Sequence, residues 1–218
     1  MAQQLKDEID ESIRRAALRV FAERGYASAT MAQIAKVAGV STGNIYLYFP
    51  SKQQLFQAVL PDEFVAELMR RMSRKVKALE GVRDIDILGP TSPYRVLSEE
   101  HVQFWITHRE RVVVLLTGAR GTAHEAFPEQ AVERLVRLAI GYLATIRPHA
   151  RVSRSTRAVL SQIYRNFLSA IASVLASYDD EEQIREMTEQ LSMYHLAGIR
   201  HLFEVMTAER VSIQKKLA

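Results

Sequence analysis

The stretch from Thr30 to Phe56, TMAQIAKVAGVSTGNIYLYFPSKQQLF, constrains the fold more than any other part of the chain. Thr30 has a hydroxyl that can cap a helix N-terminus, and Gln33 stands where a capping box places its second residue. Apolar residues then recur at helical spacing, which predicts a helix over about residues 31–38. Gly39 fits the left-handed position that ends such a helix.

A second short helix is predicted directly after this glycine. Ser41 or Thr42 can cap it, and it should end near Phe49, because Pro50 disfavours helical angles in the residue before it. Ser51 can then cap a further helix. Two short helices joined by a tight glycine turn are typical of a helix-turn-helix, whose second helix can enter the major groove of DNA.

The charge pattern of this region suits a polyanionic partner. No Asp or Glu occurs in residues 24–61, and the hydroxyl groups of the second helix can reach phosphates. Gly43 lets the backbone approach a groove wall closely. Asn44 carries the paired donor and acceptor that can read an adenine edge. The region therefore favours DNA as the partner.

Many fixed spacings in the first quarter of the chain agree with one family pattern. The residues are Ala17-Leu18, Phe21 to Tyr26, Thr30, Ile34-Ala35, Ala38 to Ser41, Gly43, Ile45-Tyr46, Tyr48-Phe49 and Ser51-Lys52. Together they resemble the TetR family of transcriptional regulators. The resemblance implies a three-helix DNA-binding domain whose recognition helix matches Ser41 to Phe49.

The resemblance also implies roles for single residues. It implies phosphate contacts from Thr30, Tyr46, Tyr48 and Lys52, and groove contacts from Thr42, Gly43 and Asn44. Position 42 often carries Lys in relatives, so Thr42 points to different base reading here. Each role has an ordinary alternative, since Thr30 caps a helix in any case, Tyr46 can pack against the first helix, and Lys52 can be a solvated lysine.

Composition limits the classes of function. The chain has 218 residues with 48% hydrophobic content, enough for a sizeable core, and its net charge of +4 permits nucleic acid. The absence of Cys excludes disulfides, Cys-ligated zinc and thiol catalysis. No apolar run approaches the roughly 20 residues of a membrane span, so no such segment is expected, and the polar, acidic N-terminus is unlike a secretory signal. A cytoplasmic protein without membrane contact is expected.

Enzymatic signatures are missing from the sequence. It contains no H-E-x-x-H, no P-loop and no G-x-S-x-G. None of the six histidines follows a Glu by three residues, so the helical di-iron pattern is absent as well. We therefore expect no catalytic residues, no metal and no cofactor other than an unidentified small-molecule effector.

The whole chain is predicted to be all-α. Only 9 Gly and 6 Pro occur, and alternating runs are few, which favours about nine helices. The DNA-binding domain is expected over residues 1–52, ending within the fourth helix, and a larger domain for ligand binding and dimerisation over residues 53–218. Pro61 should kink or interrupt the connecting helix. Predicted helices cover about residues 7–24, 31–38, 42–49, 51 onward, 93–108, 109–118, 129–146, 153–177 and 180–211, with a loop over 80–92.

Two features of the second domain follow from the resemblance. It implies a homodimer through the last two helices, with interface candidates Ile163, Phe167, Ile171, Leu191, Tyr194, Gly198 and Leu202. It also implies a small-molecule pocket among the middle helices, with candidates Phe104, Trp105, His108 and Tyr142. His101 and His108 are seven residues apart and are expected on one helix face. Packing within a single chain is the alternative for every one of these residues.

The sequence thus predicts a ligand-responsive DNA-binding transcriptional regulator. We expect a repressor that binds a near-palindromic, double-stranded operator as a homodimer and is released by a small-molecule effector. The expected mechanism is that ligand moves the fourth helix through the Pro61 region and misaligns the recognition helices. The alternative is a helical ligand-binding or scaffold protein whose N-terminal module does not bind DNA specifically.

Overall fold

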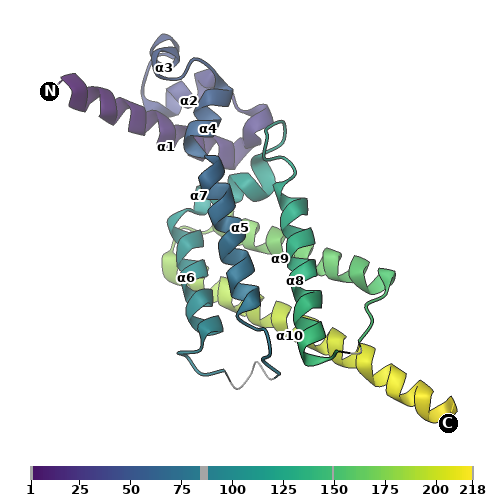
Figure 1. Ribbon diagram of the computed structural model, residues 1–218. Helices are drawn as coiled ribbons and strands as arrows, with labels where there is room; N and C mark the ends of the chain where they lie inside the picture. The colour runs from purple at the N-terminus through teal and green to yellow at the C-terminus, as the bar shows by residue number, and fades with distance from the viewer. Residues whose placement is uncertain (1, 84–87, 149, 218) are drawn as a thin grey trace.

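The computed structural model describes residues 2–83, 88–148 and 150–217, and it contains helices but no strand in these ranges (Figure 1). The all-α prediction is confirmed. A short helix, α7, continues directly into the π-helical turn η1. The order is α1 (Ala2–Ser28), α2 (Met31–Ala38), α3 (Thr42–Tyr48), α4 (Lys52–Val59), α5 (Asp62–Lys77), α6 (Pro93–Thr107), α7 (Arg109–Val113), η1 (Val114–Gly118), α8 (Phe127–Ile146), α9 (Arg154–Ser177) and α10 (Glu181–Leu217).

Helices α1 to α4 form a small unit at one end of the molecule (Figure 1). The apolar stripe of α1 is buried, and its Phe21 ring lies 5.4 Å from the ring of Phe56 on α4. Gly25 has φ 72°, so the regular part of α1 stops where the sequence predicted. The helix begins at Ala2, earlier than the predicted start near Asp7.

The connection between α4 and α5 is broken rather than kinked. Leu60 has φ −131° and ψ 71°, and Pro61 is extended with φ −71° and ψ 155°. Proline has no N–H to donate and forces the residue before it out of the helical region, so α4 ends and α5 starts afresh at Asp62. The domain boundary after residue 52 stays a prediction, and α4 packs against α1.

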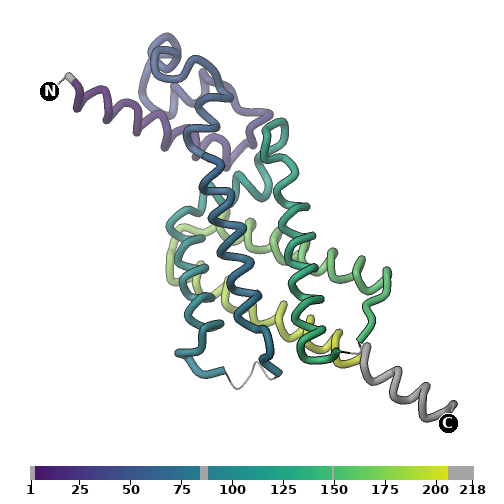
Figure 2. The backbone as a smooth tube through the Cα atoms, viewed as in Figure 1, coloured from purple at the N-terminus to yellow at the C-terminus, as the bar shows by residue number. Residues whose placement is uncertain are grey.

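Helices α5 to α10 form the larger unit, with α8 between α5 and α9, and α10 against both α9 and α6 (Figure 2). Val112 to Leu115 are buried within α7 and η1, so the apolar run there is a buried helix and not a strand. α8 starts two residues before its predicted start. Residues 84–87 of the predicted loop lie outside the described ranges.

Helix α9 corrects one expectation. By length and composition alone it could cross a membrane, although no such segment was expected. In the structure its Leu160, Tyr164 and Leu168 are buried, and the helix packs against α8 and α10. Core helices pass the same test of length and composition, so this feature alone does not indicate a membrane segment.

The two units meet where α1 packs against η1 and α7. Gly118, the last residue of η1, lies against the end of α1. A Cβ atom added to Gly118 would lie 3.1 Å from the Phe21 carbonyl oxygen and 3.4 Å from Cα of Gly25. Only a glycine allows this backbone approach without displacement, so the contact fixes the small unit on the larger one.

Candidate nucleic-acid interface and ligand cavity

The helix-turn-helix is built by local hydrogen bonds that the sequence predicted. The Gln33 backbone N–H donates to Thr30 Oγ1 at 3.2 Å, and the Thr30 backbone N–H donates to Gln33 Oε1 at 2.9 Å. Gly39 has φ 72° and ψ 24°, and its N–H bonds back to the last turn of α2. These bonds satisfy the free groups at both ends of α2, which sets the turn before α3.

Helix α3 exposes one face to solvent and buries the other. Ser41 caps it by accepting from the Asn44 N–H at 3.1 Å, while Ile45 is buried below. Thr42, Gly43 and Tyr46 are exposed, and Tyr46 keeps 48% of its surface open. Asn44 and Tyr48 are half-buried, and Thr30 is exposed at the start of α2. The face named from sequence is therefore the outward face, and its DNA contacts stay predictions.

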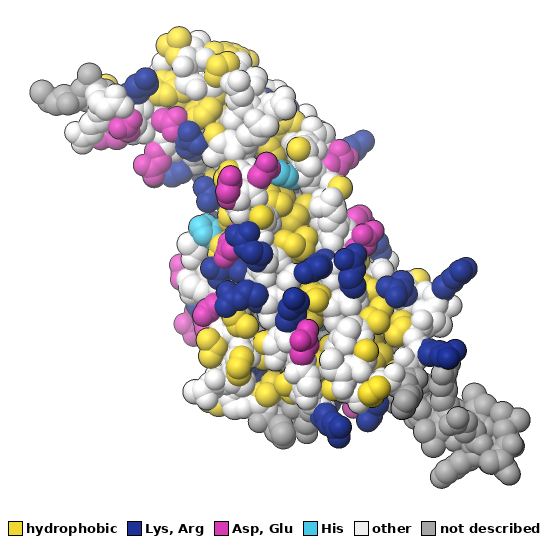
Figure 3. Space-filling view, in the orientation of Figure 1, with side chains coloured by type: hydrophobic (Ala, Val, Ile, Leu, Met, Phe, Trp, Pro, Cys, Tyr) yellow, Lys and Arg dark blue, Asp and Glu magenta, His cyan; other side chains and the backbone are white. Residues whose placement is uncertain are grey.

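Leu47 was missed by the sequence analysis. It is 81% exposed and lies on the side of α3 opposite Ile45, because two residues turn a helix by about 200°. Figure 3 shows apolar surface at this end of the molecule, where Val37 of α2 is also exposed. An apolar side chain at the most outward position of a recognition helix suits contact with a thymine methyl group. Counting helical turns from Ile45 would have found it.

Lys52 is an internal brace as well as a candidate phosphate contact. Its ammonium donates to the carbonyl oxygens of Tyr26 and Ala29 at 2.7 and 2.8 Å. Partial burial lowers the pKa of Lys52. Neither a solvated lysine nor a pure phosphate contact describes this arrangement, since two of its three donors hold the end of α1.

Arg14 of α1 makes a second set of contacts within the small unit, at the other end of α4. Its guanidinium donates to the Ala58 carbonyl at 2.9 Å, pairs with Asp10 and lies 5.1 Å from the centre of the Phe49 ring. Phe49 caps the C-terminal end of α3. Arg14 therefore links α1 and α4 to Phe49 at the C-terminal end of α3.

Most positive charge on the face shown in Figure 3 gathers over α5 and α8, away from α3. Arg70, Arg74 and Lys77 of α5 are exposed. The candidate DNA surface relies instead on hydroxyl groups, backbone and a few cations such as Lys36, in a segment free of carboxylates. This is consistent with reading a groove through shape and hydrogen bonds more than through dense charge.

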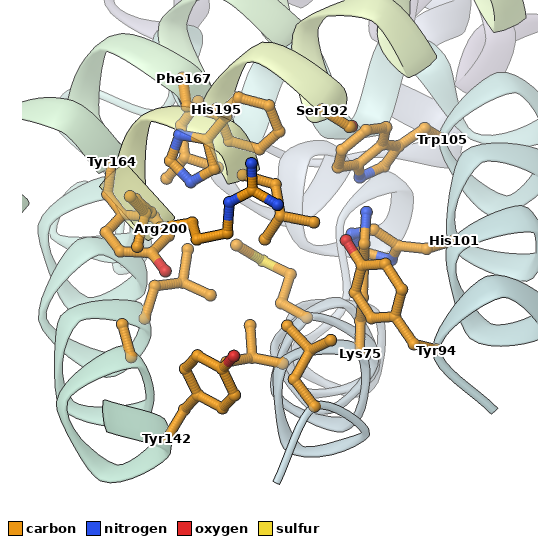
Figure 4. Close-up of a pocket in the computed structure, with 18 residues that line it drawn as sticks. Lys75, Tyr94, His101, Trp105, Tyr142, Tyr164, Phe167, Ser192, His195 and Arg200 are labelled. Atoms are coloured by element: carbon orange, nitrogen blue, oxygen red, sulfur yellow. The ribbon is translucent and has the colours of Figure 1, made fainter. Parts of the chain in front are cut away.

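A cavity of about 80 Å³ lies among the helices of the larger unit (Figure 4). Its wall comes from α5, α6, α8, α9 and α10. Trp105 and Tyr142, two of the four pocket residues named from sequence, line it, and the Tyr142 hydroxyl donates to the Val82 carbonyl at 2.8 Å. The full lining is Met72, Lys75, Val76, Leu79, Tyr94, His101, Trp105, Leu135, Ala139, Tyr142, Tyr164, Phe167, Leu168, Ser192, His195, Leu196, Ile199 and Arg200.

Phe104 and His108 do not line this cavity, so the structure does not place them with Trp105 and Tyr142, and their contact with a ligand stays a prediction. Phe104 stacks on Phe64 of α5 at 5.4 Å, and His108 packs edge-on against both rings. Adjacent residues on a helix point about 100° apart, so Phe104 faces away from the cavity that Trp105 faces. His108 has φ −119° beyond the end of α6 and leaves the helical register that relates it to His101.

The cavity also holds polar groups that the sequence analysis did not assign to it. Burial lowers the pKa of Lys75 to about 8. Burial, together with nearby Lys75 and Arg71, holds the pKa of His101 well below its usual value, and burial lowers that of His195 to about 4. His101 Nδ1 and His195 Nε2 have no hydrogen-bond partner within the described part of the chain. Both imidazoles are therefore neutral at pH 7, and each retains an unused nitrogen.

The proposed dimer residues divide into two groups. Ile171 has 0% exposed surface in the single chain, so it belongs to the internal core and we remove it from the interface candidates. Phe167 is half-buried and lines the cavity. Tyr194 is 81% exposed, Gly198 is exposed, and Ile163, Leu191 and Leu202 are half-buried. The remaining candidates therefore still present surface that a second chain could cover.

The N-terminal unit of the chain matches a known protein family. Residues 13–59 match the family described as "Bacterial regulatory proteins, tetR family". The chain is similar to the regulator TtgR of Pseudomonas putida, with 37% identity over 41% of each chain, and to the Fatty acid metabolism regulator protein of Bacillus subtilis, with 30% identity over 44% of this chain and 48% of that protein. The repressor NicS of Pseudomonas putida is 27% identical over 66% of this chain and 63% of its own length.

A solved structure of a TetR-like regulator from Rhodococcus sp. RHA1 aligns with 26% identity over 87% of this chain and 96% of that one, at a TM-score of 0.45. The chain spans about half the length of the curated relatives it matches. These relatives are transcriptional regulators, in agreement with the expectation of a non-enzymatic role. Residues 13–59 thus carry a helix-turn-helix domain of the TetR family, and the chain is similar to transcriptional regulators of that family.

Proposed function

We propose that this protein is a dimeric, ligand-responsive repressor that binds a near-palindromic operator and is released by a small molecule. The observation that carries the proposal is the outward face of α3. It presents Thr42, Gly43, Tyr46 and Leu47 on a rigid, capped helix within a segment that has no carboxylate. A polyanion meets no like charge there, and the helix has the form that a major groove accepts.

Base reading is assigned to the first turn of α3. Asn44 supplies a donor and an acceptor for an adenine edge, and Gly43 lets the backbone come close to the groove wall. Leu47 supplies apolar contact. Thr30 and Tyr46 supply hydroxyl groups for phosphates, which fix the position of the helix on the duplex without reading sequence.

Dimer formation is proposed through the exposed face of α10. Gly198 lies within this helix, where a glycine costs roughly 1 kcal/mol relative to Ala. A Cβ added there would meet no atom of its own chain within 4 Å, so internal packing does not explain the glycine. Exposed Tyr194 lies one turn before it. Close approach of a second copy of α10 accounts for both residues.

A switch needs a route from the cavity to α3. His124 lies at the junction of the two units, 3.3 Å from Asp62 of α5, and its ring lies 6.3 Å from that of Phe56 on α4. The break at Pro61 separates these two helices. We propose that an effector favours an arrangement of α5 and α6 that moves α4 about this break and changes the separation of the recognition helices.

The deciding experiment is a DNA titration of the full chain. A binding site is first selected from random-sequence duplexes and then measured by fluorescence anisotropy at two salt concentrations against nonspecific competitor. Specific binding that weakens with salt supports the regulator. No sequence preference after selection would contradict it and favour the scaffold alternative.

The dimer is tested separately by sedimentation. Tyr194→Arg should give monomers, whereas Met193→Arg, also exposed on α10 but on another face, should leave the dimer intact. Equal behaviour of the two variants would remove this face of α10 from the interface.

A further inference from the structure

The cavity beside Trp105 is not isolated. A second cavity of about 520 Å³ adjoins it between α6 and α10, and the two share Lys75, Tyr94, Ser192, Leu196 and Arg200 as wall residues. The two spaces therefore lie against one another along these side chains. The outer cavity is also lined by the carboxylates of Glu99 and Glu189, whereas Lys75 and Arg200 line both.

The charge of the inner wall has one sign. No Asp or Glu lines it, whereas Lys75 and Arg200 both do. Arg200 lies 3.8 Å from Glu204 on its own helix. Lys75 has no ion pair within the described residues, and its recorded contact is the Tyr94 ring, 5.8 Å from the ammonium. Lys75 is half-buried in a mainly apolar wall, and a partly buried ammonium without a counter-ion favours an anion as its partner.

His101 is a second polar group in the cavity wall near Lys75. The His101 side chain is buried, and its Nδ1 has no hydrogen-bond partner in the described part of the chain. Figure 4 shows the Lys75 side chain rising beside His101, with the Trp105 ring next to both. The His101 and Trp105 rings lie 4.4 Å apart. An acidic group placed here could bond to the ammonium and the imidazole together, because a carboxylate accepts several hydrogen bonds.

The rest of the inner cavity is apolar and small. Met72, Leu135 and Leu168 contribute aliphatic surface, and the volume is about 80 Å³. Engineered apolar cavities of about 150 Å³ hold a benzene molecule, so a ring fits here only by extending into the adjoining cavity of about 520 Å³. A long chain or a fused ring system would have to extend into the outer cavity.

We infer that the cavity takes an amphipathic monoanion, a carboxylic acid with a compact aromatic or alicyclic body. Its carboxylate lies against Lys75 and His101, and its body lies beside Trp105, partly in the inner cavity and partly in the adjoining outer cavity. The inference rests on the proposed function in taking this cavity as the effector site. It adds the chemical class of effector: acids are preferred to their amides, and amines are rejected by the two cations.

The test uses Trp105, the only Trp of the chain, as its reporter. Benzoate and cyclohexanecarboxylate are titrated into the full chain beside their uncharged amides, and Trp fluorescence is followed. We expect each acid to bind at least tenfold more tightly than its amide. Lys75→Met should bring the two affinities together, Lys75→Arg should retain the preference, and Lys77→Met, an exposed neighbour on α5, should leave it unchanged. Circular dichroism of each variant checks that the fold is kept.

Two results would overturn the inference. One is equal binding of acid and amide by the unaltered chain, and the other is no binding of any of the four compounds at millimolar concentration. The same samples are then tested for release of the selected DNA. Specific DNA binding without acid binding would reject the ligand class and leave the regulator intact. Acid binding without specific DNA binding would do the reverse.

Discussion

The Lys52 ammonium lies 4.3 Å from the centre of the Tyr26 ring and donates to the Tyr26 carbonyl at 2.7 Å. It therefore ties the first residue of α4 to the end of α1. We predict that Lys52→Met lowers the stability of the chain by about 1–3 kcal/mol, because a charge-assisted hydrogen-bond pair is lost from a half-buried site. Urea unfolding measures the change. Lys36→Met, an exposed lysine of the same unit, is the control and should change stability by less than about 0.5 kcal/mol.

The DNA measurements of the two variants separate bracing from phosphate contact. If Lys52 serves only as a brace, Lys52→Met keeps the salt dependence of DNA binding once the protein is folded. A reduced salt slope would show that it also neutralises a phosphate. Unchanged stability of Lys52→Met would show that the two carbonyl contacts contribute little.

Asn44 and Tyr46 should give different kinds of defect. Asn44→Ala is predicted to change which operators are preferred, by about 1–3 kcal/mol at the base it reads. Tyr46→Phe removes only a hydroxyl and should weaken binding to all operators alike, by about 1 kcal/mol. Selection from random-sequence DNA with each variant, followed by anisotropy, compares them. An unchanged preference for Asn44→Ala would contradict base reading by this residue.

The close contact between Gly118 and α1 predicts that Gly118→Ala destabilises the chain, and Gly141→Ala provides the control. Gly118→Ala places a methyl group 3.1 Å from the Phe21 carbonyl oxygen, so η1 and α1 must separate. We expect a loss of about 1–3 kcal/mol. Gly141→Ala in α8, where an added Cβ meets nothing within 4 Å, should instead stabilise by about 0.5–1 kcal/mol. Thermal unfolding of both variants decides, and equal effects would contradict a tight contact at Gly118.

Local signals in the sequence predicted the small unit well. The capping box of Thr30 and Gln33, the left-handed Gly39 and the Ser41 cap are all present, because each depends on residues within three or four positions of one another. Pro61 predicted an interruption, and the structure resolves it as a break, since the residue before it leaves the helical region.

The cavity was only half predictable, for a physical reason. Trp105 lines the cavity whereas Phe104 beside it packs on α5, and which of the two faces the cavity depends on where α5 lies. Lys75 and His195 come from helices far apart in the chain, and their meeting is a result of tertiary packing. Ile171 has the same helical spacing as an interface residue, yet it faces inward. Periodicity identifies a buried face without saying what buries it.

Lys75 gives the last prediction, which concerns pH. Burial lowers its pKa from 10.5 to about 8 in the folded chain. Below pH 8 the lysine is charged in both folded and unfolded states, and its full desolvation cost weakens the fold. As pH rises from about 8 to 10.5, the folded state loses this proton first, the unfolded state binds more protons, and stability rises. Lys75→Met removes the cost and should be more stable at pH 7, by on the order of 1–3 kcal/mol.

The advantage of Lys75→Met should therefore shrink steadily between pH 8 and pH 10.5. Groups facing Lys75 are Arg71 on α5, Tyr94 and His101 on α6, Tyr142 on α8, Tyr164 on α9, and His195 and Arg200 on α10. The pKa values of both histidines are lowered by burial, so they have lost their protons below this window. Burial raises the pKa of Tyr94 and Tyr164, so the unfolded tyrosines lose their protons first near pH 10 and stability falls there, but equally in the unaltered chain and in Lys75→Met, so this cancels in the difference. Urea unfolding at pH 7, 8, 9 and 10 measures the difference, with Lys77→Met as the control. A constant advantage across this range would mean that Lys75 does not titrate near pH 8, and a loss of stability at pH 7 would mean that its ammonium already has a partner in the folded chain.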